Sequence, residues 1–169
     1  MTNTSRLDAL NQASAKQAAE ELRACNASSR WIAAVVEKRP YPDAESLLQT
    51  AEHTARGLDW DEVRAALDAH PRIGERASGR STEAQWSRRE QSAVGTSDSR
   101  TQDALRAGNE AYERRFGHVF LIRAAGRSAE EMAAELDRRL GNDDARERAE
   151  VTEQLAQITR LRLETLLAS

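Results

Sequence analysis

The six residues His70-Pro71-Arg72-Ile73-Gly74-Glu75 end an amphipathic helix and begin a charged loop. Pro71 fixes its own φ and keeps the residue before it out of the α region, so the helix must end at or near His70. The imidazole is therefore left at a helix terminus, on a restrained backbone. A histidine in this position can act as a general acid or base near neutral pH, or it can simply bond the last carbonyls of its helix.

Caps, prolines and glycines divide the rest of the chain into about eight helical segments. Three helix starts carry a capping box, in which a Ser or Asp is followed three residues later by Gln or Glu; these are Ser14–Gln17, Asp59–Glu62 and Ser128–Glu131. Helices are expected over residues 14–24, from the 26–29 break to the residue before Pro40, and over 43–57, 59–70, 81–94, 98–116, 128–140 and 142–169. Residues 72–79 are polar and charged, and they are expected to form a loop.

The run from Val119 to Ile122 is the only strand-like stretch of the sequence, and it has no obvious partner strand. Its backbone N–H groups must still find acceptors. A planar, amide-rich ligand could supply them, as could loops or water. We therefore expect an all-α fold in which residues 1–169 form a single domain, a compact bundle of about eight helices with one short extended segment.

Composition narrows the class of protein. The 169 residues suffice for one domain with a real core, and 25 basic against 28 acidic residues leave no basic footprint for nucleic acid. No apolar run approaches the roughly 20 residues that span a bilayer, and the first residues lack a signal-peptide core. Cys25 is the only cysteine, which excludes an internal disulfide and a cysteine metal cluster. A soluble, cytoplasmic protein is expected.

Two further sets of polar residues are candidates for a site. Ser87, Glu90 and Gln91 lie at i, i+3 and i+4, so a hydroxyl, a carboxylate and an amide share one helix face. That face is either part of a site or merely solvated. Arg160 and Arg162 are two residues apart and cannot share a face, so one can point inward while the other meets solvent. An inward arginine could bind a carboxylate or a urea-type carbonyl.

Taken together, these stretches resemble the decarboxylases of 2-oxo-4-hydroxy-4-carboxy-5-ureidoimidazoline (OHCU), which act between urate and allantoin. The resemblance covers essentially the whole chain in the family's order. It is carried by His70-Pro71-Arg72-Ile73-Gly74, Ser87-Arg88-Arg89-Glu90-Gln91, Phe116-Gly117-His118-Val119-Phe120-Leu121-Ile122 and Ile158-Thr159-Arg160-Leu161-Arg162-Leu163. Many relatives carry Cys-Cys-Gly-Ser where this chain has residues 24–28, and a proline where it has Val119.

The resemblance implies an all-helical homodimer that needs no cofactor or metal and converts OHCU to (S)-allantoin. It assigns His70 as the central catalytic group and Glu90 as the residue that orients it. The substrate-binding residues that it implies are Pro71, Ser87, Gln91, the backbone amides of Phe120, Leu121 and Ile122, and Arg162. Arg72 and Glu75 receive no chemical role, and we expect them to organise the loop or the dimer surface.

Two other functions fit the same residues. The chain could be a helical binding module that keeps the fold without the activity, or a hydrolase or isomerase of another ureido compound. Presenting OHCU and following the formation of allantoin separates these hypotheses.

Overall fold

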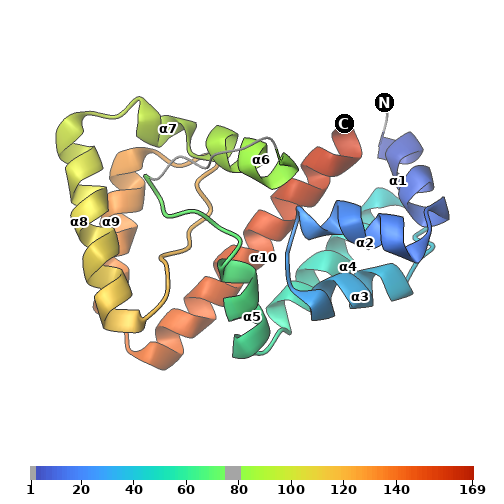
Figure 1. Cartoon of the computed structure of the whole chain (residues 1–169), viewed down its shortest axis with the longest axis horizontal. Helices are drawn as coiled ribbons and strands as arrows, with labels where there is room; N and C mark the ends of the chain where they lie inside the picture. The colour runs from blue at the N-terminus through green and yellow to red at the C-terminus, as the bar shows by residue number, and fades with distance from the viewer. Residues whose placement is uncertain (1–2, 75–80) are drawn as a thin grey trace. The chain divides into compact units, whose positions relative to one another are not determined.

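The computed structural model describes residues 3–74 and 81–169, and within them it is built of ten helices without a strand (Figure 1). The predicted all-α class is confirmed. Ten helices replace the expected eight for two reasons. Helix α1, Asn3–Gln12, was not predicted, and the helix expected over residues 81–94 is divided into α6, Thr82–Glu90, and α7, Ser92–Gly95.

The chain forms two compact units, one from residues up to Ala66 together with Leu155–Ser169, the other from Leu67–Gln154. The long helix α10, Asp144–Ala168, contributes to both. Each unit is described by itself. The organisation of residues 1–169 as a single domain stays a prediction.

The first unit contains α1 to α4 and most of α5. Helix α2, Ala15–Arg23, packs on α3, Ser29–Glu37, which in turn packs on α4, Ala44–Arg56. The buried Trp31 indole donates a hydrogen bond to the Ala51 carbonyl at 3.0 Å, which ties α3 to α4. Cys25 is fully buried here, as a small core residue would be.

The second unit is organised by α8, Ser99–Phe116, and α9, Ala129–Arg139, which pack side by side (Figure 1). The capping box predicted at Ser128 is present, and Asp98, where the helix over 98–116 was expected to begin, is the N-cap that accepts from the Thr101 amide. Gly117 ends α8 in the left-handed region at φ 80°. Residues 119–124 then run extended without strand pairing, which confirms the predicted isolated segment.

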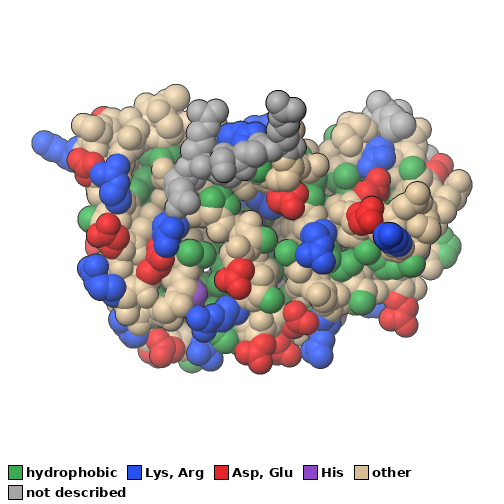
Figure 2. Space-filling view, in the orientation of Figure 1, with side chains coloured by type: hydrophobic (Ala, Val, Ile, Leu, Met, Phe, Trp, Pro, Cys, Tyr) green, Lys and Arg blue, Asp and Glu red, His purple; other side chains and the backbone are tan. Residues whose placement is uncertain are grey.

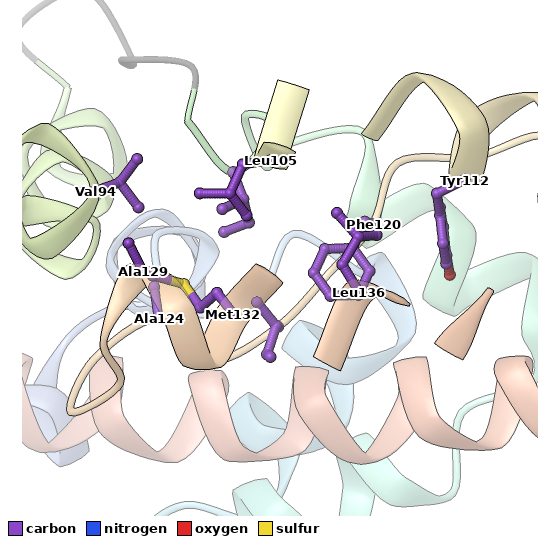
Figure 3. Packing of buried hydrophobic residues seen from close by; sticks show 10 residues of the cluster. Val94, Leu105, Tyr112, Phe120, Ala124, Ala129, Met132 and Leu136 are labelled. Atoms are coloured by element: carbon purple, nitrogen blue, oxygen red, sulfur yellow. The ribbon is translucent and has the colours of Figure 1, made fainter. Parts of the chain in front are cut away.

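The core of the second unit joins α8, α9 and the extended segment (Figure 3). Its labelled members are Val94, Leu105, Tyr112, Phe120, Ala124, Ala129, Met132 and Leu136. Tyr112 and Phe120 meet edge to face, with ring centroids 5.2 Å apart. The extended segment is thus held by apolar packing rather than by a sheet.

Charged side chains of both signs lie interspersed over the face drawn in Figure 2, in agreement with the near balance of 25 basic and 28 acidic residues. None of the helices in the described ranges is both long and apolar enough to cross a bilayer.

Candidate active site

The segment that carries His70 begins where α5, Trp60–Leu67, ends. The His70 amide donates to the Leu67 carbonyl at 2.9 Å, and the side chain is half-buried. The helix therefore ends close to His70, as Pro71 predicts. The predicted loop over residues 72–79 is described only to Gly74, so Glu75 lies outside the described residues.

Ser87, Glu90 and Gln91 lie at the C-terminal end of α6. Ser87 is only 4% exposed and Glu90 is half-buried, so this face is not merely solvated. Gln91 is the C-cap, and its amide donates to the Ser87 carbonyl at 3.1 Å. The three polar groups therefore occupy the last turn of α6, at the point where the backbone leaves the helix.

The Gln91 side chain joins this turn to the His70 segment. Its Oε1 accepts from the Gly74 amide at 2.9 Å, and its Nε2 donates to the Arg72 carbonyl at 3.4 Å. These two bonds bring together sequence motifs that lie far apart in the chain. A contact of Gln91 with substrate stays a prediction, since one amide hydrogen and one lone pair of this side chain can still serve it.

Helix α8 holds the same segment from another side. Asn109 Nδ2 donates to the Ile73 carbonyl at 2.6 Å, and Arg72 pairs with both oxygens of Glu113 at 2.7 and 3.0 Å. A cavity of about 650 Å³ lies along this face, and its lining includes Arg72, Gly74, Gln102, Arg106, Asn109 and Glu113. Arg72 therefore organises the loop, one of the two roles expected for it.

The extended segment presents a row of backbone amides. Phe120, Leu121 and Ile122 are 1%, 4% and 3% exposed. Within the described residues, the amides of these three have no hydrogen-bond acceptor. The segment is anchored by other groups, since the Arg123 amide donates to Gln154 Oε1 at 2.8 Å. Buried amides in this state are available to a ligand with carbonyl oxygens.

A buried ion pair contacts the backbone of the amide row. Arg139, 1% exposed, donates to Glu147, which is fully buried, and also to the Leu121 carbonyl at 2.8 Å. Its guanidinium lies 4.5 Å from the centre of the Phe120 ring. The Tyr112 hydroxyl donates to the same Glu147 carboxylate. Burial, and then the adjacent carboxylate, raise the pKa of Tyr112 well above its ordinary value, so it stays a donor.

The apolar core also connects the His70 segment with the amide row. Ile73, in the loop after His70, belongs to the same buried cluster as Phe120 and Ile122. The second unit therefore contains the His70 segment, the Ser87–Gln91 turn and the amide row. Gln91 joins the turn to the His70 segment, and Ile73 joins that segment to the core around the amide row.

Arg162 belongs to the first unit, where it is 4% exposed and donates to the Ala24 carbonyl at 3.1 Å. Arg160 is partly exposed and pairs with Glu45, Glu52 and Glu164. The two arginines thus face different ways, as their spacing indicates. The binding of substrate by Arg162 stays a prediction.

The residues 24–28, where the chain departs from many relatives, form a buried turn. Asn26 is 2% exposed, bonds the Thr159 hydroxyl at 3.2 Å and accepts from the Ser28 amide at 2.9 Å. A side-chain amide therefore organises the backbone of this turn.

Sequence reasoning missed the residues that hold the site from outside, namely Asn109, Glu113, Arg139 and Glu147. The sequence contained a signal for Asn109 alone. Asn109, Tyr112 and Phe116 lie at i, i+3 and i+7, so Asn109 shares a helix face with two aromatic residues. The charged residues are indistinguishable in sequence from the many solvated charges of the same helices. In the described part of the chain, no three His, Cys, Asp or Glu side chains gather as metal ligands would.

Comparison with known proteins identifies the family. A family model described as OHCU decarboxylase matches residues 11–164. The chain belongs to the OHCU decarboxylase family. An OHCU decarboxylase from Amia calva is 31% identical over 137 residues, which cover 80% of this chain and 78% of that protein. One from Haloferax volcanii is 26% identical, over 80% of each chain.

One longer protein and two solved structures are also similar to this chain. The uric acid degradation bifunctional protein TTL of Arabidopsis thaliana is 29% identical over 88% of this chain, which spans only 47% of that protein. A crystal structure of OHCU decarboxylase in the presence of (S)-allantoin superposes with a TM-score of 0.75 at 25% identity, covering 88% of this chain and 97% of that one. An (S)-allantoin synthase structure shares the fold with a TM-score of 0.70 at 16% identity, over 98% of this chain and 54% of that one.

Proposed function

We propose that this chain catalyses the decarboxylation of OHCU to (S)-allantoin in urate degradation. Membership of the OHCU decarboxylase family supports the activity. The single structural observation that carries it is the buried row of amides at Phe120, Leu121 and Ile122, without acceptors in the described residues, in the unit that also contains His70. OHCU has ring and ureido carbonyl oxygens that suit such a row.

The reaction needs little from the protein beyond orientation and charge stabilisation. Loss of CO₂ leaves an electron pair on the ring carbon, and the adjacent C=N accepts it. The protein must therefore hold the carboxylate orthogonal to the ring, stabilise the developing negative charge and deliver a proton to one face. The proposal involves neither metal nor organic cofactor.

The proposed roles of the side chains are those that the family resemblance implies. His70 takes or polarises the ring hydroxyl proton, and Glu90 orients its imidazole. The buried Ser87 hydroxyl, Gln91 and the Pro71 ring bind substrate. Those amides of residues 120–122 that face the substrate donate to its carbonyl oxygens and hold the ring in place.

The decisive experiment presents freshly made OHCU to the purified chain. OHCU is generated from urate with urate oxidase and hydroxyisourate hydrolase, and the circular dichroism of allantoin is followed. Since OHCU also decays without enzyme, the expected result is a faster reaction that yields one enantiomer. A chain that leaves both the rate and the racemic outcome unchanged would be a binding module of the same fold.

We further propose that the chain acts as one domain, because the family model spans residues of both units, and that it forms a homodimer in the cytoplasm. Light scattering after size-exclusion chromatography tests the homodimer, for which a mass of twice 18.8 kDa is expected. A mass of one chain at micromolar concentration would contradict it.

A further inference from the structure

Three backbone groups of the segment that follows His70, within residues 72–74, are bonded to side chains of α6 and α8. Gln91 binds the Arg72 carbonyl and the Gly74 amide, and Asn109 binds the Ile73 carbonyl. The Ile73 side chain is 6% exposed in the core. Loops are ordinarily the mobile parts of a fold, so a short loop with this many anchors is unusually restrained.

The restraint extends to the backbone that carries the imidazole. Between His70 and the anchored residues stands only Pro71, whose φ is fixed by its ring and which also restricts the backbone of His70. On the other side, the His70 amide is bonded to the Leu67 carbonyl at 2.9 Å. A displacement of residues 72–74 must therefore pass through a stiff connection to His70.

The burial of Asn109 has an energetic cost. It is 4% exposed, and its Oδ1 is buried without a hydrogen-bond partner among the described residues, although its Nδ2 donates at 2.6 Å to the Ile73 carbonyl. A leucine at this position would fill a similar volume without leaving a polar atom unpaired. An amide that satisfies only one of its polar atoms indicates that this single bond to the loop is what the position serves.

Glu113 lies one helical turn after Asn109 on the same face of α8. Its carboxylate forms a two-point ion pair with Arg72, which is 51% exposed. The geometry is the fork-to-fork arrangement that adds direction to an ion pair. One face of α8 thus reaches both the main chain and the side chain of the segment after His70.

We propose that Asn109 and Glu113 are positioning residues for His70, acting through the 72–74 backbone without touching the substrate. This inference rests on the proposed function of His70 in OHCU decarboxylation. Their loss lets the imidazole sample misplaced orientations, and a misplacement of about 1 Å costs an enzyme on the order of 100-fold in rate. The effect on kcat exceeds the effect on KM, because the substrate-binding amides of residues 120–122 are anchored separately, through Arg139 and Gln154.

The test compares N109L and E113Q with the matched control Gln102→Leu. Gln102 lies on the same helix and the same cavity wall, and it also donates to backbone carbonyls, those of Val94 and Ser97 at 3.2 and 3.0 Å. It does not reach residues 72–74. Steady-state kinetics on OHCU are measured below the unfolding midpoint of each variant, together with the enantiomeric excess of the allantoin.

The expected result is a fall in kcat of about tenfold or more for N109L, a smaller fall for E113Q, and KM changed less than kcat. The control keeps the kcat of the parent protein. The NMR signals of the histidine rings provide a second measurement, which a purely structural role of Asn109 would leave unchanged. Of the three histidines, His70 should shift or broaden in N109L while His53, on α4, stays unchanged.

The outcomes separate this inference from the proposed function. A parent protein that does not accelerate OHCU decarboxylation refutes the function itself. An active parent with kcat and His70 ring signals unchanged in both variants refutes the positioning role. If N109L fails to fold, E113Q, whose partner Arg72 is half-exposed, decides the question by the same two measurements.

Discussion

Arg139 and Glu147 form an ion pair that is almost completely removed from solvent, with exposures of 1% and 0%. The guanidinium donates to both oxygens of the carboxylate and to the Leu121 carbonyl. The carboxylate also accepts from the Tyr112 hydroxyl. Each partner therefore supplies the counter-charge and the hydrogen bonds that the other needs out of solvent, and Arg139 also binds the backbone of the proposed amide row.

Removing one partner of this pair should be far more harmful than removing both. Glu147→Ala leaves a buried guanidinium without its counter-charge, which is expected to lower the free energy of unfolding by about 3–5 kcal/mol. Urea denaturation measures it. The double variant Arg139→Met/Glu147→Leu should be less destabilised than Glu147→Ala, and the exposed control Glu110→Gln should change by about 0.5 kcal/mol or less. A loss for Glu147→Ala as small as the control's would show that the pair carries no such role.

His70→Ala should abolish the acceleration of OHCU decarboxylation. General acid–base groups contribute about 10²–10⁴-fold, so kcat is expected to fall by at least about 100-fold. Because OHCU still decays by itself, the allantoin that accumulates should be racemic, which circular dichroism reports directly. (S)-allantoin formed at the parental rate would remove His70 from the mechanism.

Glu90→Gln should lower activity sharply while the fold survives. The substitution keeps the shape of a half-buried side chain but removes the charge that is proposed to orient the imidazole. Kinetics on OHCU and far-ultraviolet circular dichroism are measured on the same preparation, with Glu110→Gln on α8 as the matched control. If both variants show parental kinetics, Glu90 is only a surface carboxylate.

Gly108→Ala should destabilise the second unit despite the higher helix propensity of alanine. A Cβ at Gly108 would lie 2.5 Å from Leu136 Cδ2 and 3.0 Å from its Cγ, where α8 meets α9. Overpacking costs about 1–3 kcal/mol and the propensity gain offsets about 1 kcal/mol, so a net loss of up to about 2 kcal/mol is expected in thermal or urea unfolding. Gly95→Ala, with no atom within 4 Å, is the control and should be neutral or mildly stabilising.

Arg138 should make stability depend on pH in a defined direction. It donates to Glu135 at 2.6 Å and to Glu150 at 2.5 Å, linking α9 to α10, and these hydrogen bonds hold the pKa of each carboxyl below its ordinary value of 4.5. Since the folded-state pKa values lie below the unfolded ones, the stabilisation is present above the ordinary glutamate pKa and is lost as the pH falls through the folded values.

Arg138→Met is therefore expected to lower the free energy of unfolding by about 0.5–1 kcal/mol at neutral pH, a modest value because the pair is partly exposed. The difference from the parent should shrink towards zero in urea titrations at pH 3 and below. For the control Arg114→Met, an exposed arginine with no ion pair within the described residues, any difference should stay the same at both pH values. An Arg138→Met deficit that persists unchanged in acid would contradict the assignment.

Helix boundaries were predictable where a capping residue and the backbone group that it binds lie within one helical turn of each other. Asp98 and Ser128 cap their helices through amides three residues ahead, and Gly117 supplies a left-handed residue at the end of α8. Helix α1 escaped prediction because its main apolar anchors are Leu7 and Leu10, which are buried at 4% and 2% exposure. A short helix with two apolar positions is stabilised by packing rather than by its own propensity.

The division of α6 from α7 shows the opposite situation. Nothing local stops the helix at Gln91, which has an ordinary propensity. Its side chain instead binds Arg72 and Gly74, residues that lie far back in the chain, and the backbone leaves the helix at this point.

The sequence by itself determined the all-α class, the caps, the unpaired extended segment and the end of a helix close to His70. Each of these follows from the covalent geometry of a residue or from hydrogen bonds to near neighbours in the chain. Only the tertiary structure decided that Asn109 and Glu113 hold the His70 segment, and that Arg139 and Glu147 are buried partners. A solvated and a buried polar side chain are chemically identical in a sequence, and only packing removes the water from one of them.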